Sequence, residues 1–518
     1  MDLETKKQSK DSGLANLANS GIAEFDLILR GGFPRGRMCL VQGPPGSGKT
    51  TLALQFLLAG AELGEKGVYV TFSETAGELE ASASSHGWSL NSISIVEFIK
   101  MTEIGNEEQY TVFHSADVEL VDTTKAIVEK IRALNPRRLV LDSLTELRMV
   151  ARDPLRYRRQ ILALKQAIAE QGCTVLFLDD QTTDANADLL LESIAHGVIQ
   201  LTNETSAHGG LHRRVEITKM RGVDLVEGAH DFRITKTGIR VFPRLLAASS
   251  GVMPQASSNG PALASGIREL DQLIGGPIPW GFGMMIVGPP GTGKSSLAAR
   301  FAVSAAQQGK KVCMYSFEEA VTTLLRRCKS LNIDLANPLS AGQISIQRID
   351  PSKFTPGQLT YAISTSMENN DGGMVVIDSL NGYSQAMSSE RSFVVHLHEL
   401  LSHLNAHGVT TIIVSAQHGV INVDQASFEA TYLADLVIML RYFEALGVVR
   451  QAISVIKNRG EEHERTIREF QVGKNGIRIG APLQQFQGVL TGVPTFAGQA
   501  NSLIREQDEL RNKKHNGP

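Results

Sequence analysis

The chain has 518 residues, too many for one ordinary domain core, which predicts two sizeable domains or three small ones. Hydrophobic residues make up 42% and charged residues 20%, which is the composition of a globular protein and excludes a chain that is disordered throughout. The 51 Lys and Arg residues nearly balance the 54 Asp and Glu residues, so the net charge of −3 argues against a dedicated nucleic-acid-binding protein.

The N-terminal residues MDLETKKQSKDSG are polar, and no apolar core of a signal peptide follows their positive charges. No apolar run approaches the ~18 residues needed to cross a bilayer. We therefore expect a soluble, cytoplasmic protein with no membrane partner. The cysteines lie far apart and form no CxxC pair, so we expect buried, reduced thiols at Cys39, Cys173, Cys313 and Cys328.

The chain contains the same domain twice. SGIAEFDLILRGGFPRGRMCLVQGPPGSGKTTLAL (20–54) returns as SGIRELDQLIGGPIPWGFGMMIVGPPGTGKSSLAA (265–299), and further blocks recur in the same order. The period is far longer than that of solenoid repeats, which indicates two complete domains in tandem. Residues 244–264 are small, polar and turn-rich, as in a linker. The predicted boundaries are a polar tail at 1–18, a domain at 19–243, the linker at 244–264, a second domain at 265–495 and a C-terminal tail at 496–518.

Short apolar strands alternate with amphipathic helices along each half. Residues 38–42 (MCLVQ) form an apolar segment, a glycine-rich turn follows, and residues 51–63 have helical spacing. Further short apolar segments occur at 139–142 (LVLD) and 174–179 (TVLFLD), with helical stretches between them. This alternation predicts α/β domains, each built on a mainly parallel sheet flanked by helices.

Two glycine-rich loops, residues 43–50 and 288–295, fit the pattern G-x-x-x-x-G-K-[ST] between a strand and a helix. Their glycines let backbone N–H groups surround a phosphate, and their lysines supply a positive charge to it. The hydroxyls of Thr50 and Ser295 can coordinate Mg²⁺. The residues assigned to phosphate and nucleotide binding are Gly46, Ser47, Gly48, Lys49, Thr50 and Thr51 in the first half, and Gly291, Thr292, Gly293, Lys294, Ser295 and Ser296 in the second.

Carboxylates follow two of the predicted strands in each half. Asp142 ends LVLD and Asp378 ends VVID, where an acidic residue can hold a Mg²⁺-bound water opposite the phosphate loop. Glu318 and Glu319 follow the strand CMYSF, where a carboxylate can polarise an attacking water or hydroxyl. The first half has serine before Glu74, so only the second carboxylate is kept there. A solvated acidic turn is the alternative interpretation of these glutamates.

A cationic signature, K-x-R-G, also occurs in both halves, as EITKMRG (216–222) and SVIKNRG (454–460). Residues i and i+2 of a strand point to the same face, so one lysine and one arginine can reach the same anion. An arginine supplied to a neighbour's triphosphate would stabilise transition-state charge. The alternative is an exposed strand face. The residues concerned are Lys219, Arg221, Lys457 and Arg459.

Together, the tandem loops, the glutamate pair and the repeated K-x-R-G resemble the KaiC family, the two-domain RecA-like P-loop ATPases and autokinases of the circadian clock. The resemblance extends from about Gly21 to Pro494. It implies two tandem RecA-like domains, a double-ring homohexamer with ATP and Mg²⁺ held between subunits, and KaiB-like or other signalling proteins as partners. By this resemblance, Lys49, Thr50, Lys294 and Ser295 bind nucleotide from one subunit, Lys219, Arg221, Lys457 and Arg459 reach the nucleotide of the next, and Glu318 and Glu319 are the catalytic glutamates.

The resemblance also implies autophosphorylation of adjacent hydroxyl residues just before a late strand of the second domain. Thr431 and Tyr432 match that pair, and Ser427 is a weaker candidate. Tyrosine departs from the pattern, because its hydroxyl lies several ångströms further from the backbone, so we expect Thr431 to be the acceptor. The alternative is an ordinary hydroxyl near a strand start. The first half has Glu192 opposite Thr431, which suits a first domain that is only an ATPase.

Three hypotheses follow from the sequence. The first is an ATPase in both domains with a serine/threonine autokinase in the second, acting in clock-like or stress signalling. The second is a hexameric scaffold that ATP assembles and that has no kinase activity. The third is a RecA-like ATPase acting on DNA, against which the net charge of −3 argues, because neutralising phosphates dominates such binding.

Overall fold

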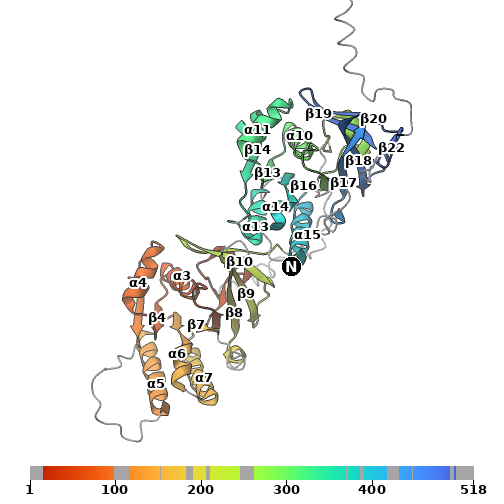
Figure 1. Ribbon diagram of the computed structural model, residues 1–518. Helices are drawn as coiled ribbons and strands as arrows, with labels where there is room; N and C mark the ends of the chain where they lie inside the picture. The colour runs from red at the N-terminus through yellow and green to blue at the C-terminus, as the bar shows by residue number, and fades with distance from the viewer. Residues whose placement is uncertain are drawn as a thin grey trace, which may run out of the picture. The chain divides into compact units, whose positions relative to one another are not determined.

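The computed structural model describes residues 16–98, 116–151, 153–181, 191–205, 211–245, 262–351, 353–367, 372–385, 390–416, 431–445, 447–489 and 495–496. The chain forms two compact units, Met1–Arg244 and Leu245–Pro518 (Figure 1). Each unit is built on its own large sheet flanked by helices. The expected class, two tandem α/β domains of RecA-like type, is confirmed.

In the first unit, the described residues form a nine-stranded sheet in the order β11-β10-β9-β8-β3-β7-β6-β4-β5. The six strands from β8 to β5 are parallel, and β9, β10 and β11 continue the sheet in antiparallel fashion at one edge. Because β3 lies between β8 and β7, the loop that follows it emerges near the middle of the sheet. The strands are β3 Met38–Gly43, β4 Gly67–Thr71, β5 Ile93–Glu97, β6 Arg138–Asp142, β7 Thr174–Asp180, β8 Gly197–Thr205, β9 Leu211–Met220, β10 Ala229–Thr235 and β11 Gly238–Phe242.

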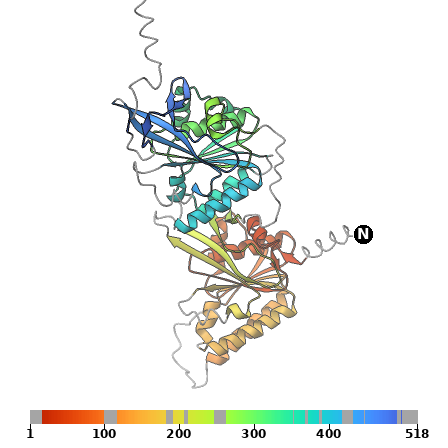
Figure 2. The same cartoon turned by 90° about the vertical axis from the view of Figure 1, so that its right-hand side faces the viewer.

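Helices cover both faces of this sheet (Figure 2, with α3 in red and α7 in orange). Alternate strand residues enter different cores: Val140 packs with α3, whereas Leu139 and Leu141 pack with α6 and α7. Local sequence sets where two of the helices begin, since Thr75 and Glu78 form a capping box and Asp153 caps a helix that starts with proline. The helices are α2 Ala23–Ile28, α3 Lys49–Glu62, α4 Ala76–Ser85, α5 Ala116–Leu134, α6 Leu144–Ala151 and α7 Pro154–Glu170.

The second unit repeats this topology strand for strand. Its described residues form a nine-stranded sheet in the order β14-β13-β15-β16-β12-β17-β18-β19-β20, again with six parallel strands followed by three antiparallel ones. The strands are β12 Gly283–Gly288, β13 Val312–Ser316, β14 Ile344–Arg348, β15 Gly373–Asp378, β16 Val409–Ala416, β17 Leu436–Ala445, β18 Val448–Asn458, β19 Arg468–Gly473 and β20 Gly476–Pro482. The helices are α9 Arg268–Ile274, α10 Lys294–Gln307, α11 Val321–Ser330, α12 Ala336–Ser340, α13 Pro356–Met367, α14 Leu380–Gln385 and α15 Glu390–Ala406.

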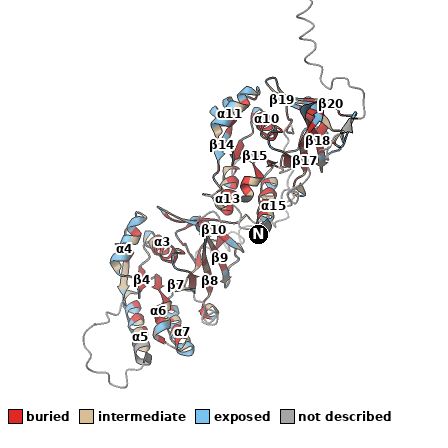
Figure 3. Cartoon of the chain, in the orientation of Figure 1, coloured by how far each residue is buried: buried red, intermediate tan, exposed pale blue. Residues whose placement is uncertain are grey.

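Burial follows the layers, with the parallel strands buried and the outer helix faces exposed (Figure 3). The four cysteines are free and buried, as expected. Among the described residues, no helix combines the length and apolar character that crossing a membrane requires. The described residues also include two-residue strands: β1 Leu17–Ala18, β2 Phe33–Pro34, β21 Phe486–Gln487 and β22 Thr495–Phe496.

Candidate functional site

The two glycine-rich loops occupy equivalent places, each between a central parallel strand and the helix that follows it. The first joins β3 to α3 and the second joins β12 to α10. Gly48 and Gly293 come directly before the helices, with φ angles of 101° and 94°. A side chain would be strained in this left-handed conformation. The glycine pattern therefore reflects a backbone shape that leaves the helix N-terminus open to an anion.

The loop lysines are buried inside their own loops. Lys49 is 8% exposed, and its Nζ donates to the carbonyl oxygens of Gly43 at 2.7 Å and Pro44 at 3.1 Å. Lys294 is 7% exposed, and its Nζ donates to Gly288 and Pro289, both at 2.7 Å. Burial lowers the pKa of Lys294, and the nearby carboxylates of Asp378 and Glu318 partly offset that effect. Both ammonium groups are thus positioned where a bound polyphosphate would lie.

Each strand-end aspartate is brought to the hydroxyl that follows the loop lysine. Asp142 lies near Thr50, and Asp378 lies near Ser295, close enough for each hydroxyl to lower the pKa of its carboxyl. Burial has the larger effect and raises the pKa of both carboxyls. Mg²⁺ takes oxygen ligands, few of them from protein, and keeps several waters. A hydroxyl and a carboxylate near each other beside the phosphate loop fit that preference in both units.

The glutamate pair of the second unit is divided between two different partners. Glu318 Oε1 accepts a hydrogen bond of 2.6 Å from the Ser379 hydroxyl. Glu319 instead binds Arg327 of α11, whose Nη2 lies 2.7 Å from Oε2 and whose Nε lies 3.2 Å from Oε1. Burial alone lowers the pKa of Arg327, but the hydrogen bond and charge of Glu319 outweigh it and raise that pKa. The negative charge of Glu319 is therefore balanced by Arg327. Glu318, in contrast, forms no ion pair with another described residue.

In the first unit, Glu74 is half-buried beside the strand-end aspartate. Its backbone carbonyl accepts from the Thr71 hydroxyl at 2.7 Å, which fixes the turn after β4. Burial raises the pKa of the Glu74 carboxyl, and the negative charges of Asp142 and Glu78 raise it further. The described part of this unit provides no ion-pair partner for Glu74. Ser73, which precedes it, is exposed.

The K-x-R-G cations lie at the opposite end of the sheet from the loops of their own unit. Lys219 pairs across β9 and β8 with Val198, which in turn pairs with Leu40, three residues before the end of β3. At about 3.3 Å per residue, the loop begins at least ~10 Å further along. The second unit repeats this register through Lys457, Val437 and Met285. Neither lysine is brought to the loop of its own unit.

Thr431 and Tyr432 lie at that same far edge, just before β17. The Nζ of Lys457 donates to the carbonyl oxygens of Thr431 at 3.3 Å and Tyr432 at 3.1 Å, and Arg459 Nη2 donates to that of Tyr432 at 3.0 Å. The side chain of Tyr432 is 54% exposed. The candidate acceptors and the K-x-R-G cations therefore share one edge, while Ser427 lies outside the described residues.

One protein-family model, that of the ATPase KaiC, matches residues 18–245 and again residues 263–484. The chain belongs to the KaiC family. It is 30% identical over 485 residues to the circadian clock oscillator protein KaiC of Parathermosynechococcus lividus, covering 92% of this chain and 87% of that protein. It is 26% identical over 487 residues to the circadian clock protein KaiC3 of Synechocystis sp., covering 93% and 95%. The KaiC of Synechococcus elongatus is 28% identical over 484 residues, covering 92% and 91%.

These comparisons confirm the resemblance noted in the sequence and establish a KaiC-type, nucleotide-binding ATPase at the level of the family. Two residues of the KaiC-like sites were missed in the sequence. Asp180 ends β7 and lies 2.8 Å from Lys49 Nζ, a position signalled by the same strand-end pattern as Asp142. Arg327 gave no comparable signal, because it lies eight positions after Glu319, on the helix that follows the turn.

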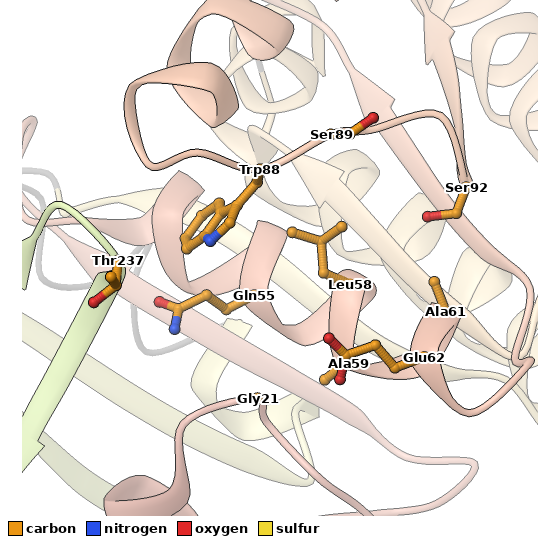
Figure 4. Close-up of a pocket in the computed structure, with 10 residues that line it drawn as sticks. All are labelled: Gly21, Gln55, Leu58, Ala59, Ala61, Glu62, Trp88, Ser89, Ser92 and Thr237. Carbon is orange, nitrogen blue, oxygen red and sulfur yellow. The ribbon is translucent and has the colours of Figure 1, made fainter.

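A pocket of about 500 Å³ opens elsewhere on the first KaiC-like unit (Figure 4). It follows the later turns of α3, including Gln55 and Glu62, and reaches Trp88 and Thr237. No residue of the glycine-rich loop lines it. The Gln55 side chain accepts a hydrogen bond of 2.7 Å from the backbone N–H of Ile239 and thereby helps to fix β11. The pocket is therefore separate from the phosphate loop, and we assign it no catalytic group.

Proposed function

We propose that this KaiC-family chain is a Mg²⁺-dependent ATPase in both domains and that its second domain phosphorylates the chain itself on Thr431. The observation that carries the proposal is the separation of two sets of groups within one sheet. Lys294 and Asp378 lie at the loop end, whereas Thr431 and Lys457 lie at the other end. A phosphate held by the loop is out of reach of Thr431 in the same domain.

A second copy of the chain brings the two sets of groups together across a subunit boundary. If the far edge of one domain contacts the loop end of the next, each nucleotide is held by a loop on one side and by K-x-R-G cations on the other. The two surfaces differ, so the contact is head-to-tail, and a head-to-tail contact that closes makes a ring. We propose a homohexamer with one ATP at each boundary between equivalent domains.

In the second domain, the residues of this chain would divide the phosphoryl transfer as follows. Lys294 and the loop N–H groups bind the phosphates, and Ser295 with Asp378 would hold Mg²⁺, which would supply positive charge to neutralise the phosphates. The Thr431 oxygen of the adjacent subunit attacks the γ-phosphorus, the bond to the β-phosphate oxygen breaks, and ADP leaves. Glu318 accepts the hydroxyl proton. Arg459 approaches from the Thr431 side and stabilises transition-state charge.

In the first domain, we propose hydrolysis alone. Glu192 occupies there the position of Thr431, because equivalent lysines bind the two backbone carbonyls. Lys219 binds the carbonyl oxygen of Glu192, and Lys457 binds the carbonyl oxygen of Thr431. Water therefore replaces the hydroxyl as the attacking group, and Glu74 accepts its proton. Because the relatives are named as circadian clock proteins, we propose that the chain acts in clock-like or stress signalling through protein partners, KaiB-like or otherwise.

The test is to incubate the purified chain with Mg²⁺-ATP and to measure intact mass, phosphopeptides and ADP release together. We expect phosphate on Thr431 and slow ADP production, both lost without Mg²⁺. ADP without phosphoprotein would reject the kinase and leave an ATPase whose output is conformational. Assembly with neither product would reject both activities in favour of a scaffold that ATP assembles.

A further inference from the structure

Five basic residues lie in or around one short segment of the first domain, residues 192–196, which leads into β8. They come from four separate parts of the chain, so it is the fold that brings them together. We call this group the basic edge. Its members are Arg37, Lys165, His196, Lys219 and Arg221.

The two lysines are anchored by backbone carbonyls of the segment. Lys165 reaches over from α7, and its Nζ donates to the Ile194 oxygen at 2.7 Å. Lys219 comes from the end of β9 and donates to the Glu192 oxygen at 2.6 Å. A carbonyl oxygen takes one of the three protons of an ammonium group and does not neutralise its charge. Both lysines thus remain able to bind an anion.

The remaining members surround His196. Arg37 Nη1 lies 3.4 Å from His196 Nε2, and the backbone N–H of Arg221 donates to the His196 carbonyl at 2.9 Å. Burial, followed by the charges of Lys165, Arg37 and Arg221, lowers the pKa of His196 to about 4. Burial and the other cations also lower the pKa of Lys165. The basic groups therefore repel one another. The Glu192 carboxylate offsets part of this effect at Lys219, and a further anion among the cations would relieve the repulsion more fully.

The second domain provides an internal comparison, because the same edge there lacks three of these basic groups. Asp435 replaces His196, because each side chain accepts a hydrogen bond from the first backbone N–H of the central strand. His196 Nδ1 accepts from Met38 at 3.3 Å, and Asp435 Oδ2 accepts from Gly283 at 3.0 Å. The β3–β7 and β12–β16 registers align the remaining positions, at which Phe282 replaces Arg37 and Leu401 replaces Lys165.

We propose that the basic edge binds the triphosphate of the nucleotide carried by the first-domain loop of the adjacent subunit, with Arg37 and Lys165 adding contacts that the second domain lacks. This inference rests on the proposed head-to-tail arrangement. Its consequence is that removing either of these two side chains weakens assembly of the first ring with ATP, and weakens it more than assembly with ADP.

The experiment measures the concentration of Mg²⁺-ATP, and separately of Mg²⁺-ADP, that gives half-maximal hexamer by native mass spectrometry or sedimentation. Full-length chain with Lys294→Ala is used so that assembly reports on the first ring. Arg37→Phe and Lys165→Leu install the residues of the second domain. Lys165→Gln removes the charge but keeps a donor for Ile194, which guards against a folding defect. Arg159→Leu, which removes an exposed charge from the same helix, is the matched control.

We expect Arg37→Phe, Lys165→Leu and Lys165→Gln each to raise the required ATP concentration roughly tenfold or more, as for loss of one hydrogen bond to a charged group, with a smaller rise for ADP and almost none for Arg159→Leu. Lys219→Ala and Arg221→Ala test the arrangement itself. If these two weaken assembly while the Arg37 and Lys165 variants do not, the basic edge is overturned and the proposed function stands. If none of them changes assembly, the head-to-tail arrangement fails as well.

Discussion

Arg327 binds both carboxylate oxygens of Glu319 and also donates to the hydroxyl of Ser296 at 2.5 Å, which ties the turn after β13 to the phosphate-loop helix. Such a bidentate pair is among the stronger charge-assisted contacts in proteins. In the first domain the equivalent position on α4 is Ser82, and Glu74, the equivalent of Glu319, has a raised pKa instead. The two domains therefore keep different carboxylates available beside their phosphate loops.

This difference predicts unequal effects of two similar substitutions in the second domain. In a Lys49→Ala background, which silences the first domain, Glu318→Gln should lower ADP release and Thr431 phosphorylation by about 100-fold or more, the usual contribution of a general base. Glu319→Gln should cost less than about tenfold, because Arg327 already neutralises that side chain. Both rates are measured on the same samples by ADP release and phosphopeptide mass spectrometry. Equal losses would show that Glu319 also takes part in the proton transfer.

The raised pKa of Glu74 predicts a pH dependence for the first domain. Glu74 must be ionised to accept a proton, so hydrolysis should fall as the pH falls through its pKa, which lies above the ordinary glutamate value of about 4.3. Glu78→Gln removes one of the negative charges that raise this pKa, so the fall should move to lower pH. Gln can still serve in the capping box of α4.

The measurement is ADP release against pH in a Lys294→Ala background. Glu80→Gln removes an exposed charge from the same helix and serves as the control, with no shift expected. Glu74→Gln should lower the rate about 100-fold or more across the whole range. A profile that Glu78→Gln leaves unmoved would mean that another group controls the pH dependence.

The sequence was most informative where chemistry depends on local backbone shape or on position along a strand. The loop glycines and the strand-end aspartates could be predicted because a left-handed residue before a helix, or a carboxylate at a parallel strand end, leaves a local pattern. The contact of Arg327 with Glu319 and the approach of Lys165 to Ile194 could not. Both depend on how a helix packs beside a sheet, which no short spacing encodes.

Arg138 gives a stability prediction for the first domain. Its side chain is fully buried, and it donates to Glu65 at 2.6 Å and to the carbonyl oxygens of Asn19 and Phe56, both at 2.7 Å. Arg138→Met should lower the free energy of unfolding of this domain by about 3–5 kcal/mol, because it leaves buried acceptors without a partner. Arg35→Met, which removes a more exposed partner of Glu65, should cost less than about 1 kcal/mol.

Thermal unfolding followed by calorimetry would separate these variants, since about 3 kcal/mol corresponds to a drop of roughly 6–12 °C for a domain of this size. ATP is left out so that ligand binding does not mask the difference. The transition of the second domain should stay unchanged, since Met374 fills the position of Arg138 there. Similar losses for the two arginines would mean that burial adds little to the Arg138 network.

The last prediction concerns which hydroxyl accepts the phosphate. Thr431→Ala should remove phosphorylation, whereas Tyr432→Phe should leave it nearly unchanged, because the phenolic oxygen lies too far from the backbone for a site that accepts threonine. Tyr432→Thr shortens that reach and should create a second phosphorylated residue, read as a further mass increase and an additional phosphopeptide. Phosphate on Tyr432 in the unaltered chain would contradict this geometry. It would require the backbone at Thr431 and Tyr432 to lie further from the neighbouring nucleotide. Lys457 and Arg459 bind the carbonyl oxygens of that backbone.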